Sequence, residues 1–385
     1  MKVASSWDVV IVGASFAGLA AATQLAGRGS VLLIDRKPVG EGETSACATP
    51  LPVLARLGAL DAVEQVHTEL VIHTGAGRAV SVTPAYPFAT FDYRKLCLIL
   101  RSRTDAPLLL DAVRAREGDT VITHKGSFRA RVLIDASGCE RVLSLKSKGR
   151  AASLSLGIEA RAPVAGDGLH LWLRPKELSC GMAWIFPAGG HSRIGVACYR
   201  GQGGLRRRLS AFSPPTVGQP LHGGRLPSRL AAATDGAVIR VGDAAGQCLP
   251  VTGEGIRPAL VFGQTAARLV RLVLAGDIEL AHALSAYRRQ VARRAPYYNF
   301  LRLVQAALLR APTRLSPSFI AAIAAAFQTA PGQATYWGAA DPMSLDVGGA
   351  GNHDVQQGPP DADSDSAQLP LRRSSVRHAT IGLGR

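Results

Sequence analysis

A glycine-containing turn between an apolar strand and a helix constrains the fold of this chain more than any other feature. Val9–Val12 is a continuous apolar run, as a strand buried on both faces requires, and Leu19–Leu25 has the Ala/Leu-rich character of a helix. Between them, Gly13 permits a tight turn, the small Ser15 lets the backbone approach a phosphate, and Gly18 lets helix and strand pack closely. This order predicts a nucleotide-binding βαβ unit rather than an ordinary turn with a chance pair of glycines.

The second half of this unit favours a dinucleotide as the ligand. The next apolar strand, Val31–Ile34, ends in Asp35, which is placed to accept hydrogen bonds from ribose hydroxyls. The helix N-terminus supplies N–H groups and a positive dipole for phosphates. Ser15 stands where this fingerprint usually has a glycine, so a Cβ must be tolerated there. We expect the unit to contribute the cofactor-binding residues Gly13, Ala14, Ser15, Phe16, Ala17, Gly18, Asp35 and Arg36.

Two later segments decide which dinucleotide is expected. Leu133–Gly138 is an apolar strand ending in D-A-S-G, and Val241–Gly246 ends in G-D-A-A-G and is followed by Pro250–Ile256. In this order the three segments resemble the FAD-contacting segments of flavoproteins of the para-hydroxybenzoate hydroxylase superfamily, over residues 7–275. An NAD-dependent dehydrogenase needs only the first segment, so the resemblance implies that FAD is the cofactor.

The resemblance also implies roles for single residues. Asp243 takes the place of the family's aspartate that hydrogen-bonds ribityl or ribose hydroxyls; its alternative is an N-cap of the next helix. Gly253–Ile256 take the place of a turn and helix N-terminus at the flavin's pyrimidine edge, where N–H groups stabilise the anion of reduced flavin. Arg94 lies where relatives place a residue near the pyrophosphate; Tyr93 fits equally well, and a solvated helix charge is the alternative. The residues implied are Ala46, Arg94, Asp135, Gly138, Gly242, Asp243, Gly253, Glu254, Gly255 and Ile256.

Three details within that superfamily are similar to geranylgeranyl reductases. Thr252–Ile256 reads T-G-E-G-I, similar to the P-x-x-G-E-G-I pattern of that family. Gly181–Pro187, followed by Gly195, is similar to its Y-x-W-x-F-P…G pattern, with Met182 in the place of the tyrosine. The third detail is Cys47, because that family often has a cysteine near the flavin.

This resemblance implies a reductase of C=C bonds in an isoprenoid chain, geranylgeranyl or polyprenyl. Trp184, Phe186 and Pro187 are then expected to bind substrate as the wall of an apolar cavity, where affinity comes from buried CH₂ and CH₃ groups; an ordinary apolar core is the alternative. Cys47 is the candidate catalytic residue, as a proton donor; its alternative is a small buried hydrophobe. The expected electron donor is NAD(P)H or another external reductant.

A different flavin chemistry is the competing interpretation. An FAD-dependent monooxygenase or a flavin halogenase acting on an aromatic or other small molecule would use the same cofactor motifs. Halogenases carry a similar W-x-W-x-I-P element, and they usually also have a catalytic lysine in an early K-x-x-G-type segment. Residues 36–50 contain Lys37 but no such pattern, which favours the reductase.

The predicted fold class is α/β, with a Rossmann-like FAD-binding domain, an antiparallel-sheet substrate domain and a helical C-terminal region. Short β-rich segments separated by Gly and Pro are typical of an antiparallel sheet and occupy residues 151–200. We expect an FAD-binding domain over 1–90, 120–150 and 230–275, a substrate domain over 91–119 and 151–229, a helical region over 276–337, and a disordered tail over 338–385.

The formal net charge of +16 is concentrated in one part of the chain. Residues 200–315 hold 17 Arg, no Lys and five acidic residues, and therefore carry +12 of it. Within them, the arginine-rich run 288–294 leads into the aromatic run 297–301, which suits a helix at an anionic membrane surface. A solvated basic face is the alternative. No nucleic-acid partner is expected, because no helix-turn-helix, zinc finger or RNA-binding motif accompanies the charge.

The sequence also carries expectations about location. The first apolar strand starts at residue 7, which leaves no room for a secretory signal, and no uninterrupted apolar stretch of roughly 18 residues predicts a transmembrane helix. The six cysteines form no C-x-x-C pair and do not cluster with histidines, so we expect neither a metal site nor a disulfide framework. We expect a cytoplasmic protein, peripheral on the inner face of the cell membrane.

Overall fold

The elements predicted around the glycine turn are present, with small changes at their ends. The computed structural model describes residues 5–338, apart from 75–78, 145–153, 175–176, 179, 202 and 311–315. Strand β1 (Ser5–Val12) leads through the turn into helix α1 (Phe16–Leu25) and strand β2 (Val31–Asp35). β1 and β2 pair in parallel, and their apolar residues are buried on both faces of the sheet.

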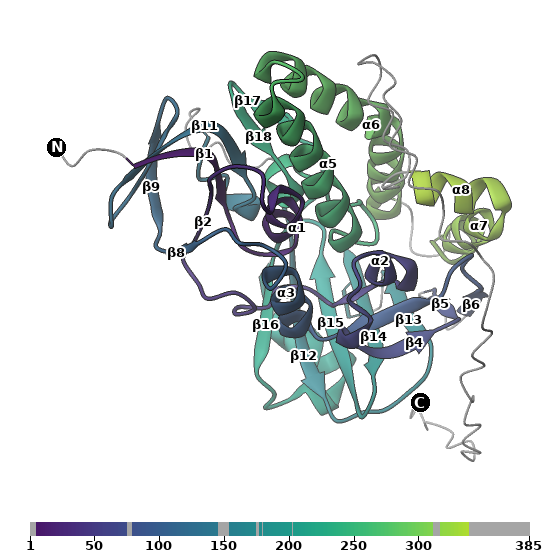
Figure 1. The fold of residues 1–385 in the computed structure, drawn as a ribbon. Helices are drawn as coiled ribbons and strands as arrows, with labels where there is room; N and C mark the ends of the chain where they lie inside the picture. Colours follow the sequence, from purple (N-terminus) through teal and green to yellow (C-terminus); the bar gives the residue numbers. More distant parts are fainter. Residues whose placement is uncertain are drawn as a thin grey trace, which may run out of the picture. The chain divides into compact units, whose positions relative to one another are not determined.

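The sheet that contains β1 has eight strands within the described residues, and Figure 1 shows it beside α1 and α5 (Ile256–Ala275). Its main path runs β17-β18-β11-β1-β2-β8, with β10 and β9 extending from β11. The pairs from β18 to β8 along this path are parallel. The added strands are β8 (Leu108–Leu110), β9 (Val113–Glu117), β10 (Thr120–Thr123), β11 (Ser127–Asp135), β17 (Thr234–Asp235) and β18 (Val238–Arg240). The carboxyl ends of β1, β11 and β18 share one edge, which brings together the three motifs that follow them.

Helices cover the face of this sheet on which α1 lies. Helix α5 (Ile256–Ala275) packs along α1, and Gly263 permits the close approach because a Cβ there would lie 2.3 Å from the carbonyl oxygen of Ala17. By length and composition α5 could cross a membrane, but 67% of the relevant window is buried inside the protein, as in a core helix. Helix α3 (Tyr93–Arg101) also packs on α1 and is capped by Asp92, which accepts a 2.8 Å hydrogen bond from the Lys95 N–H.

The predicted antiparallel sheet forms the second layer. Its order across the described residues is β16-β12-β15-β14-β13-β5-β6, and every neighbouring pair is antiparallel except β13 and β5. The strands are β5 (Leu70–His73), β6 (Ala79–Val82), β12 (Leu154–Ala162), β13 (Leu169–Leu173), β14 (Gly181–Ala188), β15 (His191–Cys198) and β16 (Leu221–Pro227). Helix α4 (Leu205–Phe212) packs on β15. A three-stranded sheet holds β3 (Ala48–Pro50), β7 (Phe88–Phe91) and β4 (Val63–His67), and helix α2 (Leu51–Arg56) follows β3.

Sheet membership divides the chain differently from the predicted domain boundaries. The segment 70–82, predicted within the FAD-binding domain, forms β5 and β6 of the second sheet. The segment 108–117, predicted within the substrate domain, forms β8 and β9 of the first sheet. Apolar alternation indicates that a segment is a strand, but it does not indicate which strand lies beside it, because pairing partners are distant in sequence.

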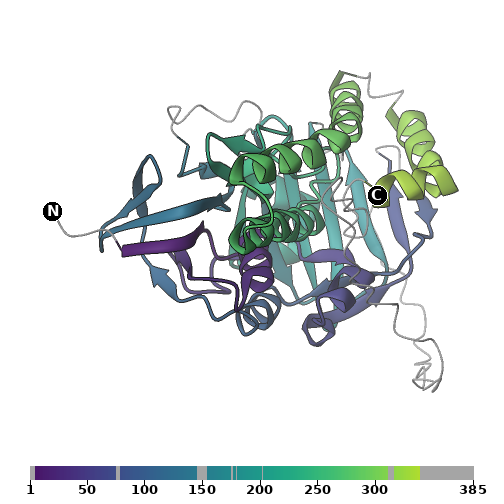
Figure 2. The ribbon, with the colours of Figure 1, turned by 45° about the horizontal axis from the view of Figure 1, so that its top comes forward.

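The C-terminal region is helical, as predicted. It contains α6 (Leu280–Arg310), α7 (Ser316–Gln328) and α8 (Ala330–Gly338), and Pro296 lies inside α6. Figure 2 shows α7 and α8 beside the strands at one edge of the second sheet, and Gln328 donates to the Ser81 carbonyl of β6 at 2.6 Å. The tail predicted over 338–385 lies outside the described residues after Gly338.

Candidate functional site

One continuous cavity of about 1310 Å³ is lined by all the sequence motifs. The turns after β1, β11 and β18 and the N-terminus of α5 line one part, and β12, β13, β14, β16 and the helices α6 to α8 line the rest. The predicted site residues on its wall are Gly13, Ala14, Ser15, Phe16, Ala17, Asp35, Arg36, Ala46, Gly138, Gly242, Asp243, Gly253, Glu254, Gly255 and Ile256, together with Trp184 and Phe186. The nucleotide motifs and the aromatic motif therefore meet in one space.

The first glycine turn has the geometry that a pyrophosphate-binding turn needs. Gly13 has a φ of +108°, and a Cβ there would lie 2.3 Å from the carbonyl oxygen of Ala136. A Cβ on Gly18 would lie 1.8 Å from the carbonyl oxygen of Gly13, so only glycine lets α1 start this close to the turn. The Asp35 carboxylate accepts a 2.7 Å hydrogen bond from the Ala14 N–H, which fixes the turn against the end of β2.

The serine that replaces the usual second glycine is accommodated by a tyrosine. The Ser15 Oγ lies 3.1 Å from the Tyr93 hydroxyl, and Tyr93 also lines the cavity. Ser15 is the N-cap of α1 but makes no side-chain capping bond, so its hydroxyl is held by Tyr93 instead. Of the two α3 positions considered for the pyrophosphate, Tyr93 lies on the cavity wall.

Asp243 presents a deeply placed carboxylate to the same cavity. Burial raises the pKa of this carboxyl to about 6, only partly offset by the charge of Arg141. Within the described part of the chain its carboxylate accepts no hydrogen bond, although it keeps partial exposure to the cavity. A buried acceptor of this kind fits a ligand hydroxyl, because hydrogen bonds to the ionised form repay part of its desolvation.

The glutamate of the T-G-E-G-I run is held by a buried arginine. The Glu254 carboxylate accepts from Arg257 at 2.8 and 3.3 Å, and the Arg257 side chain is fully buried. Arg257 also donates to the backbone carbonyl of Tyr336 at 3.1 Å and lies 4.2 Å from the centroid of that ring. The pair therefore ties helix α8 to the N-terminus of α5, with Glu254 and Tyr336 both on the cavity wall.

Trp184 is fixed in the wall from two sides. Its indole Nε1 donates a 2.6 Å hydrogen bond to Oε2 of Glu159, which lies on β12, two strands away in the sheet. Its ring lies over Gly195 of the paired strand, where a Cβ would lie 2.1 Å from Trp184 Cζ2. The glycine of the Y-x-W-x-F-P…G pattern therefore provides the space for the indole, and Phe186 continues the aromatic wall at a ring distance of 6.4 Å.

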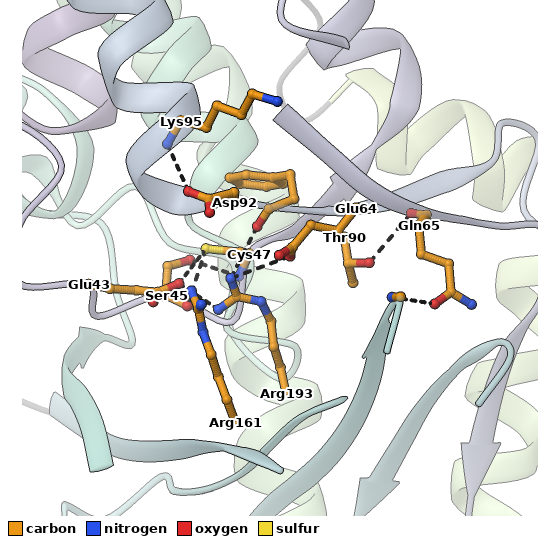
Figure 3. A network of polar contacts seen from close by, with 12 residues as sticks. Glu43, Ser45, Cys47, Glu64, Gln65, Thr90, Asp92, Lys95, Arg161 and Arg193 are labelled. Atoms are coloured by element: carbon orange, nitrogen blue, oxygen red, sulfur yellow. Dashed lines mark hydrogen bonds and ion pairs between the residues drawn. The ribbon is translucent and has the colours of Figure 1, made fainter. Parts of the chain in front are cut away.

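Cys47 lies in a buried polar network behind the wall. Its thiol donates to Glu43 Oε1 at 3.1 Å, and Figure 3 shows it between Glu43 and Arg193. Arg193 is fully buried and reaches Glu43 at 2.5 Å and the Phe91 carbonyl at 3.2 Å. Burial raises the pKa of the Cys47 thiol well above its ordinary value. Cys47 also has a φ of +49°, an unusual conformation for a residue other than glycine.

Five predicted site residues are not among the described residues on the wall, and their contacts explain why. Cys47 faces Glu43, as above, and Gly18 serves the packing of α1. The Asp135 carboxylate accepts from the N–H groups of Ser137 and Leu143 at 3.1 and 3.2 Å, which shapes the D-A-S-G loop. The Pro187 carbonyl accepts from Thr90 at 2.7 Å, and Arg94 lies beside Gly40.

Sequence reasoning missed several residues of the wall. Glu159 is a buried carboxylate on β12, and its partner His222 lies on β16, 63 residues later. Phe327, Thr335 and Tyr336 reach the cavity from α7 and α8. No local motif marks these positions; the alternation of β12 places Glu159 on the face of Ser155 and Gly157, opposite to Leu156 and Ile158, and does not single it out.

The residues present fit an FAD molecule. A glycine cradle and an unobstructed helix N-terminus suit the pyrophosphate, while Asp35 and Asp243 offer carboxylates for hydroxyl groups. The Asp35 carboxylate accepts hydrogen bonds from the N–H groups of Ala14 and Lys37, and its remaining acceptor sites can bind ligand hydroxyls.

Comparison with known proteins agrees with this fit. A search against models of protein families finds no match for the chain. The chain is 24% identical over 310 residues to the digeranylgeranylglycerophospholipid reductase of Methanocaldococcus jannaschii, covering 69% of this chain and 78% of that protein. It is 27% identical over 323 residues to digeranylgeranylglycerophospholipid reductase 1 of Methanopyrus kandleri, covering 73% and 85%.

Solved structures share the fold. A geranylgeranyl bacteriochlorophyll reductase-like protein from Thermoplasma acidophilum matches with a TM-score of 0.74 at 16% identity, over 89% of this chain and 98% of that chain. PqsL of Pseudomonas aeruginosa, described as a probable FAD-dependent monooxygenase, matches with a TM-score of 0.62 at 19% identity, over 82% of this chain and 100% of that chain. The myxobacterial FAD-dependent halogenase CndH matches at 0.62 with 16% identity, over 86% and 93%. Together the comparisons support an FAD-dependent oxidoreductase. The predicted α/β fold class is confirmed.

Proposed function

We propose that this chain uses FAD to reduce C=C bonds of an isoprenoid chain. The observation that carries the proposal is the continuity of the cavity from the nucleotide turn to an apolar wall. Beyond the motif residues the wall includes Ile72, Leu171, Val304, Ile323 and Phe327. A hydrocarbon chain gains roughly 0.8 kcal/mol for each CH₂ group that it buries, so such a wall favours a long apolar substrate over a small polar one.

The chain's own residues have separate tasks in this proposal. The turn at Gly13 and the N-terminus of α1 hold the pyrophosphate, and Asp35 and Asp243 accept hydrogen bonds from hydroxyl groups. The N-terminus of α5 supports negative charge on the pyrimidine edge of the flavin. Bound FAD supplies the capacity to transfer a hydride. Trp184 and Phe186 hold the hydrocarbon against the flavin and exclude water.

The reductase is favoured over a monooxygenase or halogenase on two grounds. The curated relatives reported above are both digeranylgeranylglycerophospholipid reductases, and the reductase-like structure matches with the higher TM-score, 0.74 against 0.62. The apolar wall also suits an isoprenoid better than an aromatic acid.

Anaerobic incubation with lipid tests the proposal. Purified protein with FAD and dithionite is mixed with geranylgeranyl or polyprenyl lipid, and products are analysed by mass spectrometry. We expect products that gain two hydrogens for each double bond reduced, and none without FAD. Hydroxylated or halogenated products formed only in air, with NADPH consumed, would assign the chain to the competing chemistry. NADPH supplied in place of dithionite tests the electron donor.

We also propose that α6 meets an anionic membrane. Arg288, Arg289 and Arg293 are exposed on this helix, and further along Phe300 and Leu303 are 58% and 62% exposed. Phe300 also lines the cavity, so the exposed apolar side chains of α6 adjoin the cavity, and a lipid at the membrane could enter the cavity there. Part of the arginine excess has a different role, because Arg240, Arg257 and Arg294 are buried and hydrogen-bonded inside the protein.

Co-sedimentation with vesicles tests this surface. We expect binding to vesicles that contain phosphatidylserine, weaker binding to pure phosphatidylcholine, and loss of binding at high salt. Phe300→Ala with Leu303→Ala should weaken binding, whereas Val217→Ala, which changes a 64% exposed apolar residue after α4, should not. Equal binding to both vesicle types would remove the electrostatic part of the proposal.

A further inference from the structure

A buried carboxylate on an apolar cavity wall needs an explanation. The Glu159 side chain is only 3% exposed, yet Glu159 lines the cavity. Burying an ionised carboxylate costs several kcal/mol unless it is paired and hydrogen-bonded. Its oxygens accept from Trp184 at 2.6 Å and His222 at 2.9 Å, and Arg193 lies 3.4 Å away. These three donors occupy three of its roughly four acceptor sites, so about one remains.

His222 connects this carboxylate to the surface. Its side chain is 21% exposed, and its Nε2 lies 2.9 Å from Glu159 Oε1. The two residues face each other across the pairing of β12 with β16, in which Glu159 stands opposite His222. An imidazole has two ring nitrogens, so a histidine can accept a proton at one and donate a proton from the other.

The charges around the pair leave room for one additional proton. The charged or titratable groups that face it, directly or through Arg193 or Glu43, are Glu43, Cys47, Glu64, Arg161 and Arg193. Burial alone raises the pKa of Glu43, but Arg193, the Cys47 thiol and Arg161 together outweigh it and hold that pKa below its ordinary value. By formal charge, the three carboxylates of Glu43, Glu64 and Glu159 face two guanidinium groups, so this cluster of described residues is one positive charge short. A proton shared by His222 and Glu159 balances it.

We propose that His222 and Glu159 form a proton path from the surface to the cavity, and that Glu159 protonates the substrate. This inference rests on the proposed function. In the reduction the C=C π bond breaks, one carbon accepts hydride from the reduced flavin, and the other forms a C–H bond with the proton of the Glu159 carboxyl. The O–H bond of Glu159 breaks and leaves a carboxylate. His222 then takes a proton from water at its other ring nitrogen and passes the Nε2 proton to that carboxylate, which restores the pair.

Amide variants separate this role from a structural one. Glu159→Gln keeps an oxygen that accepts from Trp184, and His222→Gln keeps an N–H donor, but neither amide exchanges protons near neutral pH. Glu64→Gln is the matched control, because it removes a carboxylate from the same cluster. Glu64 is not among the described residues that line the cavity. The Trp184 emission reports whether the wall itself is intact.

The first arm needs neither FAD nor substrate. Emission of Trp184, isolated by subtracting the spectrum of Trp184→Phe, is followed against pH. We expect a titration in the native protein and in Glu64→Gln, a shifted midpoint in His222→Gln, and a flat profile in Glu159→Gln. An unchanged titration in Glu159→Gln overturns the proton path.

The second arm follows single turnover of reduced, FAD-loaded protein with isoprenoid. We expect Glu159→Gln to slow substrate reduction by about 10²–10⁴-fold, with FAD affinity unchanged, and His222→Gln to change the alkaline limb of the pH profile, because the step consumes a proton. Turnover of Glu159→Gln equal to that of Glu64→Gln overturns the proposal. A native protein that reduces no isoprenoid, yet shows the Trp184 titration, contradicts the proposed substrate while supporting the proton pair.

Discussion

Gly195→Ala tests the arrangement of the cavity wall most sharply, because the added methyl group has no room. A Cβ at this position would lie 2.1 Å from Trp184 Cζ2 and 2.7 Å from the carbonyl oxygen of Ile158. The indole cannot simply slide away, since the 2.6 Å hydrogen bond to Glu159 holds its other edge. Either the indole leaves its place or β15 shifts from its neighbours.

The loss in the free energy of unfolding caused by Gly195→Ala follows from these contacts. Overpacking a core typically destabilises a protein by about 1–3 kcal/mol. Losing the hydrogen bond between Trp184 and the Glu159 carboxylate adds about 1.5–3 kcal/mol, because the acceptor is charged. We therefore expect the free energy of unfolding to fall by roughly 2.5–6 kcal/mol, a large part of the ~5–15 kcal/mol typical of a folded protein.

Urea unfolding followed by circular dichroism measures this loss. Gly190→Ala is the matched control, because Gly190 lies in the same hairpin and a Cβ there has nothing within 4 Å. Trp184→Phe should relieve part of the clash, so the double variant should cost less than the sum of the single ones by about 1 kcal/mol or more. If Gly195→Ala unfolds at the same urea concentration as Gly190→Ala and the double variant is additive, the reasoning is refuted.

Three further predictions concern residues on the cavity wall and directly behind it. Arg257→Met should destabilise the protein by about 3–5 kcal/mol in urea unfolding, because Glu254 is left without its partner, whereas exposed Arg289→Met should stay within about 0.5 kcal/mol; equal effects would contradict the role of the pair. FAD affinity, measured by fluorescence quenching, should fall as the pH drops through about 6, because protonation of Asp243 competes with its acceptance of ligand hydroxyls; Asp243→Asn should flatten that profile, and an unchanged profile would exclude Asp243. Cys47→Ala should keep turnover of the same order, because the thiol faces Glu43; loss of turnover with FAD still bound would support Cys47 as the catalytic residue.

The parts of the fold that depend on local order could be predicted from the sequence. The turn at Gly13, the strands ending at Asp135 and near Gly242, and the N-terminus of α5 were predicted because each motif adjoins the element that positions it. The membership of β5 in the antiparallel sheet and of β8 in the sheet that contains β1 could not be predicted, because strands pair with partners that are distant in sequence.

In the candidate site too, local motifs could be predicted from the sequence and long-range contacts could not. Trp184 and Phe186 were predicted on the cavity wall from their motif, and they lie there. The contacts of Glu159 with His222 and of Arg257 with Tyr336 join residues 63 and 79 positions apart, and no periodicity connects them. Cys47 was selected by its neighbourhood in sequence, but the left-handed backbone at that residue directs its thiol to Glu43.

The most direct test of the account is anaerobic turnover of the dithionite-reduced, FAD-loaded protein with a geranylgeranyl lipid. The account predicts that the flavin absorbance returns as the lipid gains pairs of hydrogens in the mass spectrum, and that Glu159→Gln slows both changes together. Flavin that stays reduced with unaltered lipid, in a protein that binds FAD normally, would contradict the proposed function.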